Sequence, residues 1–137
     1  MRIFFDSSAF AKRYLDEAGS EEVEAACFAA SALGVCRLCV PEVVSAFNRR
    51  LRDSSLPPEK YLLVKNRLLE EVRDAETVDL TPEVIVRSLV VLETNVLRAS
   101  DALHVASALE WGAELFVSSD QRQLRAANKS GLATRQV

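Results

Sequence analysis

The sequence predicts an α/β domain built around a parallel sheet. Short runs of β-branched and aromatic residues alternate with longer segments of helical period, which is the pattern of consecutive βα units. The chain has 137 residues, of which 49% are hydrophobic and 27% charged, so it is long enough for one hydrophobic core and short for two. We therefore expect a single domain over residues 1–137.

The chain is expected to begin with a strand at Arg2–Phe5, because an apolar run follows the first basic residue. Ser7 or Ser8 then caps a short helix that runs through Tyr14. Ser20 is followed by two glutamates and opens a second helix, since acidic side chains favour the positive end of a helix dipole.

The middle of the chain predicts one strand and a helical hairpin. The strand is Val35–Val40, and Pro41 follows it where a first helical residue belongs, so a helix is expected to run to about Arg52. A proline pair breaks the chain, and Glu59–Asp74 then carries apolar residues at helical spacing.

The last part of the chain alternates strands and helices again. Proline after Thr81, the hydroxyl of Ser100 and the glycine after Trp111 mark helix ends. The expected strands are Thr77–Leu80 and Leu115–Ser118, and the expected helices are Pro82–Thr94, Ser100–Trp111 and Gln121–Lys129.

Four carboxylates fall at the ends of these strands or in the first turn of the next helix: Asp6, Glu42, Asp101 and Asp120. In open parallel sheets such positions line the crevice beyond the carboxyl ends of the strands. Carboxylates gathered there repel one another and require a cation, and Mg²⁺ or Mn²⁺ suits carboxylate and water ligands. Each acid taken alone is equally compatible with a role as a helix cap or a first-turn charge.

The sequence around the four acids resembles the four acidic blocks of PIN-domain ribonucleases, and above all the VapC-like toxins of type II toxin–antitoxin pairs. The matching runs are Ile3–Phe10 (IFFDSSAF), Pro41–Phe47 (PEVVSAF), Ser100–Ala108 (SDALHVASA) and Phe116–Leu124 (FVSSDQRQL). The resemblance covers essentially the whole chain. It implies a three-layer α/β/α PIN-like fold with a central parallel sheet of four to five strands.

The resemblance also implies an endoribonuclease that depends on Mg²⁺ or Mn²⁺, in which all four acids are catalytic residues and metal ligands. The first three match the family's core acids, and Asp120 matches its more variable fourth. Ser8 and Ser118 match two hydroxyl positions that support the site. Some relatives carry a further acid soon after the fourth, where this chain has Gln121–Gln123, so the number of metal ions stays open.

Partners and location are expected from the same resemblance. It implies a homodimer, an RNA substrate and a cognate antitoxin protein, for which the Leu56–Val72 hairpin offers apolar surface. An odd number of cysteines, three, favours reduced thiols in a cytoplasmic protein over a disulfide framework. No run is apolar enough for a secretory leader or a membrane span, so neither is expected.

The charge balance excludes a protein that coats nucleic acid by bulk charge. Seventeen basic residues against twenty acidic ones give a formal net charge of -3. The basic residues are uneven, however, and follow two of the four acids along the chain. Arg49, Arg50 and Arg122 are the predicted contacts to RNA phosphates, although charged runs on helices are equally compatible with a solvated surface.

Two further motifs invite a functional interpretation. Cys36 and Cys39 have the spacing of zinc or dithiol sites, but the chain has no second cysteine pair and a single histidine. If both lie in the predicted strand, they point to opposite faces and are buried thiols. His104 follows Asp101 by one helical turn, so it is either a proton carrier or phosphate contact near the site, or a packed helix residue.

Two alternatives to a ribonuclease stay open at this point. One is a catalytically silent PIN-fold binding module. The other is another Mg²⁺-dependent phosphate-handling α/β domain, but a phosphatase needs a second Asp where Ser8 stands. A phospho-accepting receiver needs a Lys after the last strand, where Ser119 and Asp120 stand.

Overall fold

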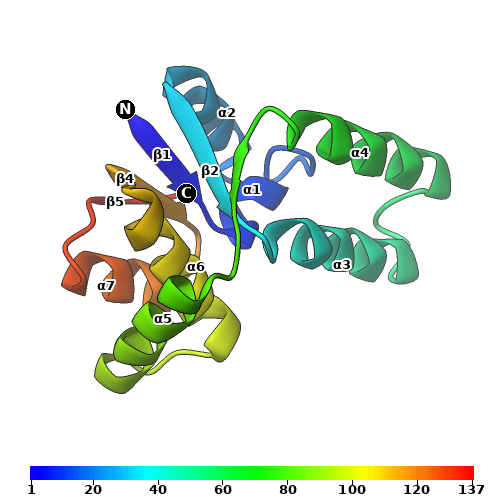
Figure 1. Ribbon diagram of the computed structural model, residues 1–137. Helices are drawn as coiled ribbons and strands as arrows, with labels where there is room; N and C mark the ends of the chain where they lie inside the picture. Colours follow the sequence, from blue (N-terminus) through cyan, green and yellow to red (C-terminus); the bar gives the residue numbers. More distant parts are fainter.

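The computed structural model describes residues 1–137 and contains a five-stranded parallel sheet with seven helices (Figure 1). The strands are β1 (Arg2–Phe5), β2 (Ala32–Cys36), β3 (Glu76–Val78), β4 (Leu115–Ser118) and β5 (Thr134–Gln136). The helices are α1 (Ser7–Ala11), α2 (Ser20–Ala29), α3 (Cys39–Arg52), α4 (Pro58–Glu71), α5 (Pro82–Thr94), α6 (Ala99–Trp111) and α7 (Gln121–Lys129). The strand order is β3-β2-β1-β4-β5, which places β1 at the centre.

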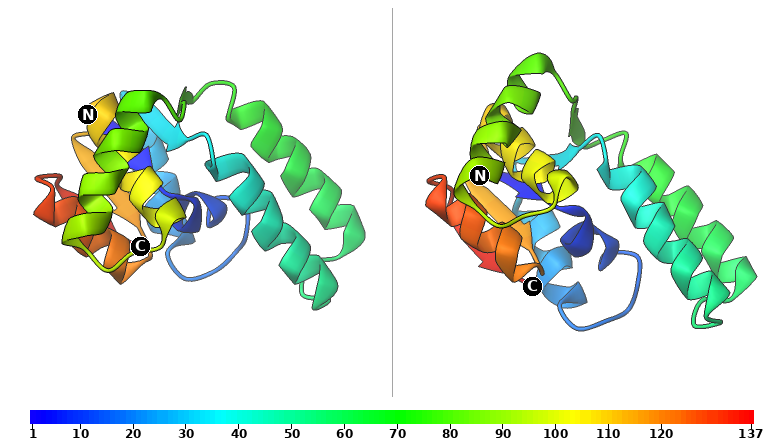
Figure 2. Two further views of the ribbon diagram at one scale, coloured as in Figure 1. Left: turned by 60° about the horizontal axis from the view of Figure 1, so that its bottom comes forward. Right: turned by 90° about the horizontal axis from the view of Figure 1, so that it is seen from below.

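The sheet has helices on both faces, as the predicted three-layer fold requires. Alternate residues of β1 and β4 enter different cores, because side chains along a strand point to opposite faces. Phe4 and Phe116 pack with α5, α6 and α7, whereas Phe5 and Val117 pack with α1 to α4. The α3–α4 hairpin extends away from the sheet like an arm (Figure 2).

Gly34 in β2 allows one close approach in this packing. A Cβ atom there would lie 2.9 Å from three ring atoms of Trp111, closer than carbon atoms pack. The indole of Trp111 therefore lies directly on the β2 backbone and holds α6 against the sheet. Because Asp101 belongs to the first turn of α6, this contact also helps to fix the position of that acid.

Most predicted elements are confirmed, with errors at several boundaries. The strands at Arg2–Phe5 and Leu115–Ser118 and the helix at Gln121–Lys129 have the predicted bounds. The first helix is capped by Asp6 rather than by a serine, and it ends at Ala11. The helix predicted to start at Ser100 instead starts at Ala99, without a side-chain cap.

The predicted strand Val35–Val40 is wrong at both ends, and β2 begins three residues earlier, at Ala32. The strand stops at Cys36, and α3 begins at Cys39, so Pro41 lies at the third helical position. A proline is tolerated throughout the first helical turn, where a backbone N–H has no helical partner. The two cysteines therefore lie in different elements and in different cores, and burial raises the pKa of both thiols. All three cysteines are free.

A charged network joins α4 to the chain around α1. The Glu71 carboxylate accepts hydrogen bonds from Arg13 Nε and Arg67 Nε at 2.7 Å and from the Tyr14 hydroxyl at 2.9 Å. Burial disfavours the charged form of Glu71, but these hydrogen bonds outweigh it and lower its pKa. A carboxyl whose pKa is lowered by folding stabilises the protein above its unfolded pKa, and this contribution is lost as the pH falls through the folded pKa.

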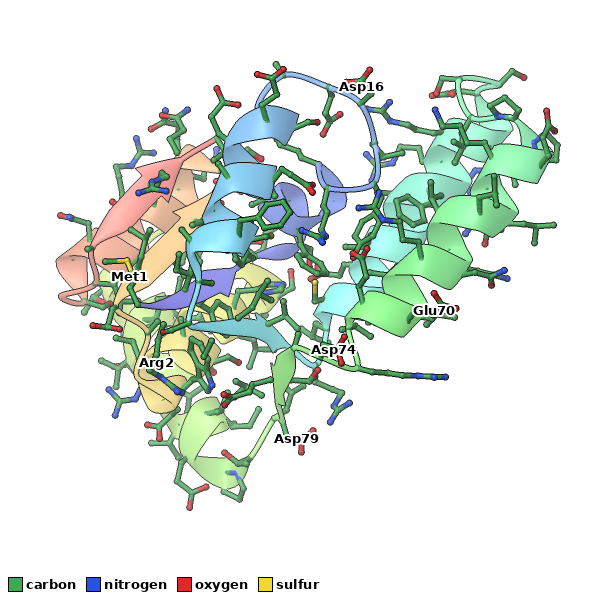
Figure 3. All side chains as sticks on the ribbon, turned by 90° about the horizontal axis from the view of Figure 1, so that it is seen from above. Met1, Arg2, Asp16, Glu70, Asp74 and Asp79 are labelled. Carbon is green, nitrogen blue, oxygen red and sulfur yellow. The ribbon has the colours of Figure 1, made fainter.

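Replacing Glu71 with Gln is therefore expected to lower the free energy of unfolding at pH 7 by about 1 kcal/mol. The difference from the wild type should shrink as the pH falls below about 4, where the carboxyl is protonated in the unfolded chain. Urea unfolding over a pH series measures both. Glu70→Gln is the matched control, because Glu70 is exposed on the same helix (Figure 3). An equal loss in both variants, or a loss that does not change with pH, contradicts the role of the network.

Candidate active site

Asp6 lies at the centre of the sheet edge, directly after β1. Its carboxylate is fully buried and caps α1, with Oδ1 accepting the Ala9 backbone N–H at 2.9 Å. The Ser8 hydroxyl lies 2.8 Å from both carboxylate oxygens, and the Ser118 hydroxyl donates to Oδ2 at 2.8 Å. Burial raises the pKa of Asp6, and the charge of His104 and these hydrogen bonds oppose that rise. The two serines, which the family resemblance implies as supporting residues, therefore both contact the Asp6 carboxylate.

The same serines connect Asp6 to Asp120. Because β1 and β4 are parallel neighbours, their carboxyl ends meet at one edge of the sheet. The Asp120 backbone N–H donates to Ser118 Oγ at 2.9 Å, and the Ser119 N–H donates to Ser8 Oγ at 3.2 Å. The Asp120 carboxylate caps α7 by accepting the N–H groups at the start of that helix. Asp120 thus serves as a helix cap and also lies within the hydrogen-bonded surroundings of Asp6.

Glu42 enters from α3 and is held by a buried histidine. Its Oε1 lies 2.5 Å from His104 Nε2 and accepts the Ser7 hydroxyl at 2.8 Å. Burial raises the pKa of Glu42, but the hydrogen bond and charge of His104 and the bond from Ser7 outweigh this, so its pKa is lowered. His104 is 1% exposed, and its Nδ1 is buried without a partner. The structure therefore gives His104 a role in positioning Glu42.

Asp101 enters from the first turn of α6 and is also buried. Its Oδ1 accepts a hydrogen bond from Gln123 Nε2 at 3.1 Å, and its Oδ2 accepts one from Arg98 Nε at 3.1 Å. The hydrogen bond and charge of Asp101 raise the pKa of Arg98, and the charges of Asp120 and Glu42 add to this effect. The Arg98 guanidinium is thus paired with Asp101, and the charges of Glu42 and Asp120 act on it without direct contact.

The donor set fits a hard divalent cation in its chemistry. The four acids supply carboxylate oxygens, which Mg²⁺ and Mn²⁺ prefer, and the charges of Asp101, Asp120 and Glu42 raise the pKa of the nearby Arg98. Their spacing is wider than a metal requires, because no three His, Cys, Asp or Glu side chains lie close enough to hold an ion. The side chain of Arg98 is 78% exposed, so moving it away from Asp101 requires little repacking.

The residues predicted to contact RNA line two separate clefts. Arg49 and Arg50 line a cleft of about 500 Å³ together with Glu42, Ser8 and Lys12, which we call the α1–α3 cleft. Arg50 is paired with Glu17 there, whereas Arg49 has no ion-pair partner. Arg122 does not reach this cleft and lines a separate one. The structure thus brings Arg49 and Arg50, but not Arg122, beside Glu42.

Several residues of the site are missing from the sequence-based prediction. They are Ser7, Lys12, Arg98 and Gln123. Lys12 follows Asp6 at the end of the short helix α1, and Arg98 precedes Asp101 by three residues, so proximity to a predicted acid was the available signal. Gln123 carried a weaker signal, since it falls where some relatives have an acid.

The chain belongs to the PIN domain family, whose family model matches residues 3–129. No curated protein sequence matches the chain. A similar fold occurs in VapC20 of Mycobacterium tuberculosis, which is described as a toxin that cleaves the sarcin–ricin loop. The two structures align with a TM-score of 0.73 and 13% sequence identity, over 98% of this chain and 99% of the other.

Two further structures have similar folds. A toxin–antitoxin complex from Klebsiella pneumoniae has a TM-score of 0.72 and 14% identity, over 98% of this chain and 99% of the matched one. VapBC2 of Rickettsia felis, bound to DNA from its promoter, has a TM-score of 0.69 and 9% identity, over 100% and 99%. The TM-scores show that these proteins share the fold, and they confirm the predicted resemblance to VapC toxins at that level. None of the helices has the length and apolar character needed to span a membrane.

Proposed function

We propose that the protein is a metal-dependent endoribonuclease and the toxin of a toxin–antitoxin pair. The observation that carries this proposal is the placement of Asp6, Glu42, Asp101 and Asp120 at one edge of the sheet in a PIN fold. Ser118 joins the Asp6 carboxylate to the Asp120 backbone N–H, and Arg98 is paired with Asp101. If each acid served only as the cap or first-turn charge of its own helix, these contacts between the acids and their neighbours would not be needed.

The four acids and the metal ion would have different parts in the proposed reaction. Bound Mg²⁺ or Mn²⁺ would offset charge on the scissile phosphate and lower the pKa of an attacking water. Asp6 and Asp101, both buried, would hold the ion with Asp120 and Glu42. Glu42 Oε1 is occupied by His104 and Ser7, which leaves Oε2 to face the ion. The attacking water would pass its proton to solvent or to one of the carboxylates, and the leaving 3′ oxygen would take up a proton from solvent. In-line attack at phosphorus leaves a 5′-phosphate and a 3′-hydroxyl.

RNA is the proposed substrate on grounds of family rather than of reaction chemistry. None of the steps uses the 2′-hydroxyl, but the similar toxin from Mycobacterium tuberculosis is described as cleaving an RNA loop. The α1–α3 cleft provides Lys12 and Arg49, whose positive charges attract phosphates beside Glu42. Arg50 contributes less charge to this cleft, because Glu17 already neutralises it.

The proposal includes two protein partners in the cytoplasm. Exposed leucines on α4, Leu62, Leu63 and Leu69, form the surface proposed for a cognate antitoxin. Helix α5 exposes a second group of aliphatic residues, and this face is proposed to join two copies in a homodimer. The residues of that group are Ile85, Val86, Leu89 and Val90.

One observation favours a second candidate, a PIN-fold binding module without metal or catalysis. No three carboxylates approach closely enough to hold an ion, and Arg98 already supplies a positive charge beside them. In that case Arg98 would neutralise the acids permanently, and the protein would bind neither Mg²⁺ nor Mn²⁺.

The experiment that tests the proposed function is cleavage of an end-labelled single-stranded RNA by the purified protein. We expect internal cleavage in Mg²⁺ or Mn²⁺, 5′-phosphate ends on the products, and no cleavage in EDTA. Unchanged cleavage in EDTA would contradict metal dependence. Intact RNA under every metal condition, with a correctly folded protein, would support the binding module instead.

A further inference from the structure

Helix α7 carries a basic surface that the proposed mechanism does not use. Arg122, Arg125 and Lys129 are exposed and form no ion pair with any carboxylate; we call these three residues the α7 basic face. In contrast, Arg13, Arg50, Arg67 and Arg87 are each paired with a glutamate. The sequence contains no Asp or Glu after Asp120, so no acid of that segment neutralises this face.

The α7 basic face lines a cleft between α7 and the end of α5. The cleft has a volume of about 420 Å³, and its other lining residues are Thr94, Asn95 and Val96, none of which is acidic. Lys129 Nζ donates a hydrogen bond to the Thr94 carbonyl oxygen at 2.8 Å. This bond holds the ammonium group at the cleft without cancelling its charge. The positive charge of the cleft therefore favours binding of an anion.

The same helix is part of the four-acid site. Asp120 caps its first turn, and its buried residue Gln123 donates to Asp101. The α7 basic face begins at Arg122, beside both contacts, and runs to Lys129, roughly 10 Å farther along the helix axis. That distance corresponds to about three nucleotides of a stacked strand, at roughly 3.4 Å each. A polyanion that enters the site can therefore reach this face without leaving the surface.

The fold places α7 and the α1–α3 cleft on different sides of the central strand. Helix α3 follows β2, and α7 follows β4, while β1 lies between these two strands (Figure 1). Basic side chains thus flank the four acids from both sides, with Lys12 and Arg49 on one and the α7 basic face on the other.

We infer that the α7 basic face binds the phosphate backbone of the RNA at nucleotides beyond the scissile bond. This inference rests on the proposed function, since it assigns a second contact to the same substrate. Guanidinium and ammonium groups bind phosphate irrespective of base, so the contact adds affinity and salt dependence but no sequence preference. An acidic segment of a protein partner is the competing occupant.

The inference is tested by RNA binding in the Asp6→Asn protein, which is expected to leave the RNA intact. Fluorescence anisotropy would compare a 12-nucleotide and a 3-nucleotide single strand over a salt series, with and without the double substitution R125E/K129E. We expect the affinity for the longer strand to fall about tenfold or more, and the slope of log K against log salt to weaken by roughly 0.7 for each lost phosphate contact. The shorter strand should lose much less affinity.

The matched control is K60E/R73E, which makes the same change of charge at two exposed residues near the ends of α4, outside both clefts. It should leave both affinities within about twofold of the parent, since exposed charges a Debye length away are largely screened. Circular dichroism checks the fold of each variant, and R125Q/K129Q replaces the charge reversal if that protein does not fold.

Several outcomes would overturn the inference. Equal RNA affinity in R125E/K129E and K60E/R73E removes the proposed contact. Unchanged RNA binding with weakened binding of an antitoxin would assign the α7 basic face to a protein. Wild-type cleavage measured in parallel separates these failures from a failure of the function itself: if the wild type cuts RNA, only the subsite is wrong, and if it does not, both proposals fall.

Discussion

Asp6→Asn is expected to reduce metal-dependent RNA cleavage by about a thousandfold or more. A divalent ion bound at this site would provide several kcal/mol of charge stabilisation, and each 1.36 kcal/mol corresponds to roughly a factor of ten in rate. Asp6 is fully buried and central among the acids, so an amide there removes one negative charge and one ligand oxygen. The measurement is the initial rate of cleavage of a labelled RNA in Mg²⁺ or Mn²⁺.

The fold should survive this change, because Asn retains an oxygen that can accept the Ala9 N–H at the start of α1. Circular dichroism and thermal unfolding check this point. Asp16→Asn is the matched control, since Asp16 is exposed in the loop before α2 (Figure 3) and should keep wild-type activity. A rate within tenfold of the wild type in Asp6→Asn would show that the cleavage occurs elsewhere.

Phe47→Ala is expected to cost about 3–5 kcal/mol of unfolding free energy, a large part of the stability of a small domain. Phe47 is fully buried, and its ring meets the Tyr14 ring edge-on with centroids 6.1 Å apart. It lies on α3 and joins that helix to the core beneath the sheet. Since Glu42 is on the same helix, the loss of packing should also loosen the Glu42 contact with His104.

Chemical denaturation measures this cost from the shift of the midpoint at constant slope. Phe28→Ala is the control, because the Phe28 side chain is 83% exposed and its removal should change the stability by less than about 0.5 kcal/mol. Similar shifts in the two variants would mean that the core around α3 is not packed as described.

The sequence predicts elements well where the local signals are strong. Leu115–Ser118 is an apolar run that ends before a capping aspartate, and both its bounds are confirmed. The start of α3 was misplaced because Cys39 and Val40 suit a strand as well as a helix, and only the turn at Arg37 and Leu38 ends β2. β5 is a short, polar edge strand whose pairing with β4 no periodicity reveals.

The sequence predicts the edge of the sheet at which the candidate site lies, but not the side-chain contacts within the site. The parallel sheet explains why Asp6 and Asp120 meet at one edge, and this follows from the order of strands and acids. The pairing of Glu42 with His104 depends on how α3 and α6 pack, which a single sequence does not encode locally. The same applies to the electrostatic effect on Arg98, whose pKa is raised by acids from different parts of the chain.

The net charge of -3 is compatible with a nucleic-acid substrate once the acids are placed. Four of the twenty acids belong to the candidate site, which leaves sixteen against seventeen bases elsewhere. The basic side chains without an ion-pair partner are not spread evenly, since Arg49 lies beside Glu42 and the α7 basic face lies beside Asp120. The protein is therefore suited to binding RNA locally around the four acids.

The measurement that tests the central proposal most directly is a calorimetric titration of the purified protein with Mn²⁺, compared with the Asp6→Asn variant. We predict saturable binding of at least one ion to the wild type and loss of that binding in the variant, because the four acids are the proposed ligands of the ion. No binding to the wild type, or equal binding to both proteins, would contradict the account and leave the acids neutralised by side chains such as Arg98 instead of by a metal ion.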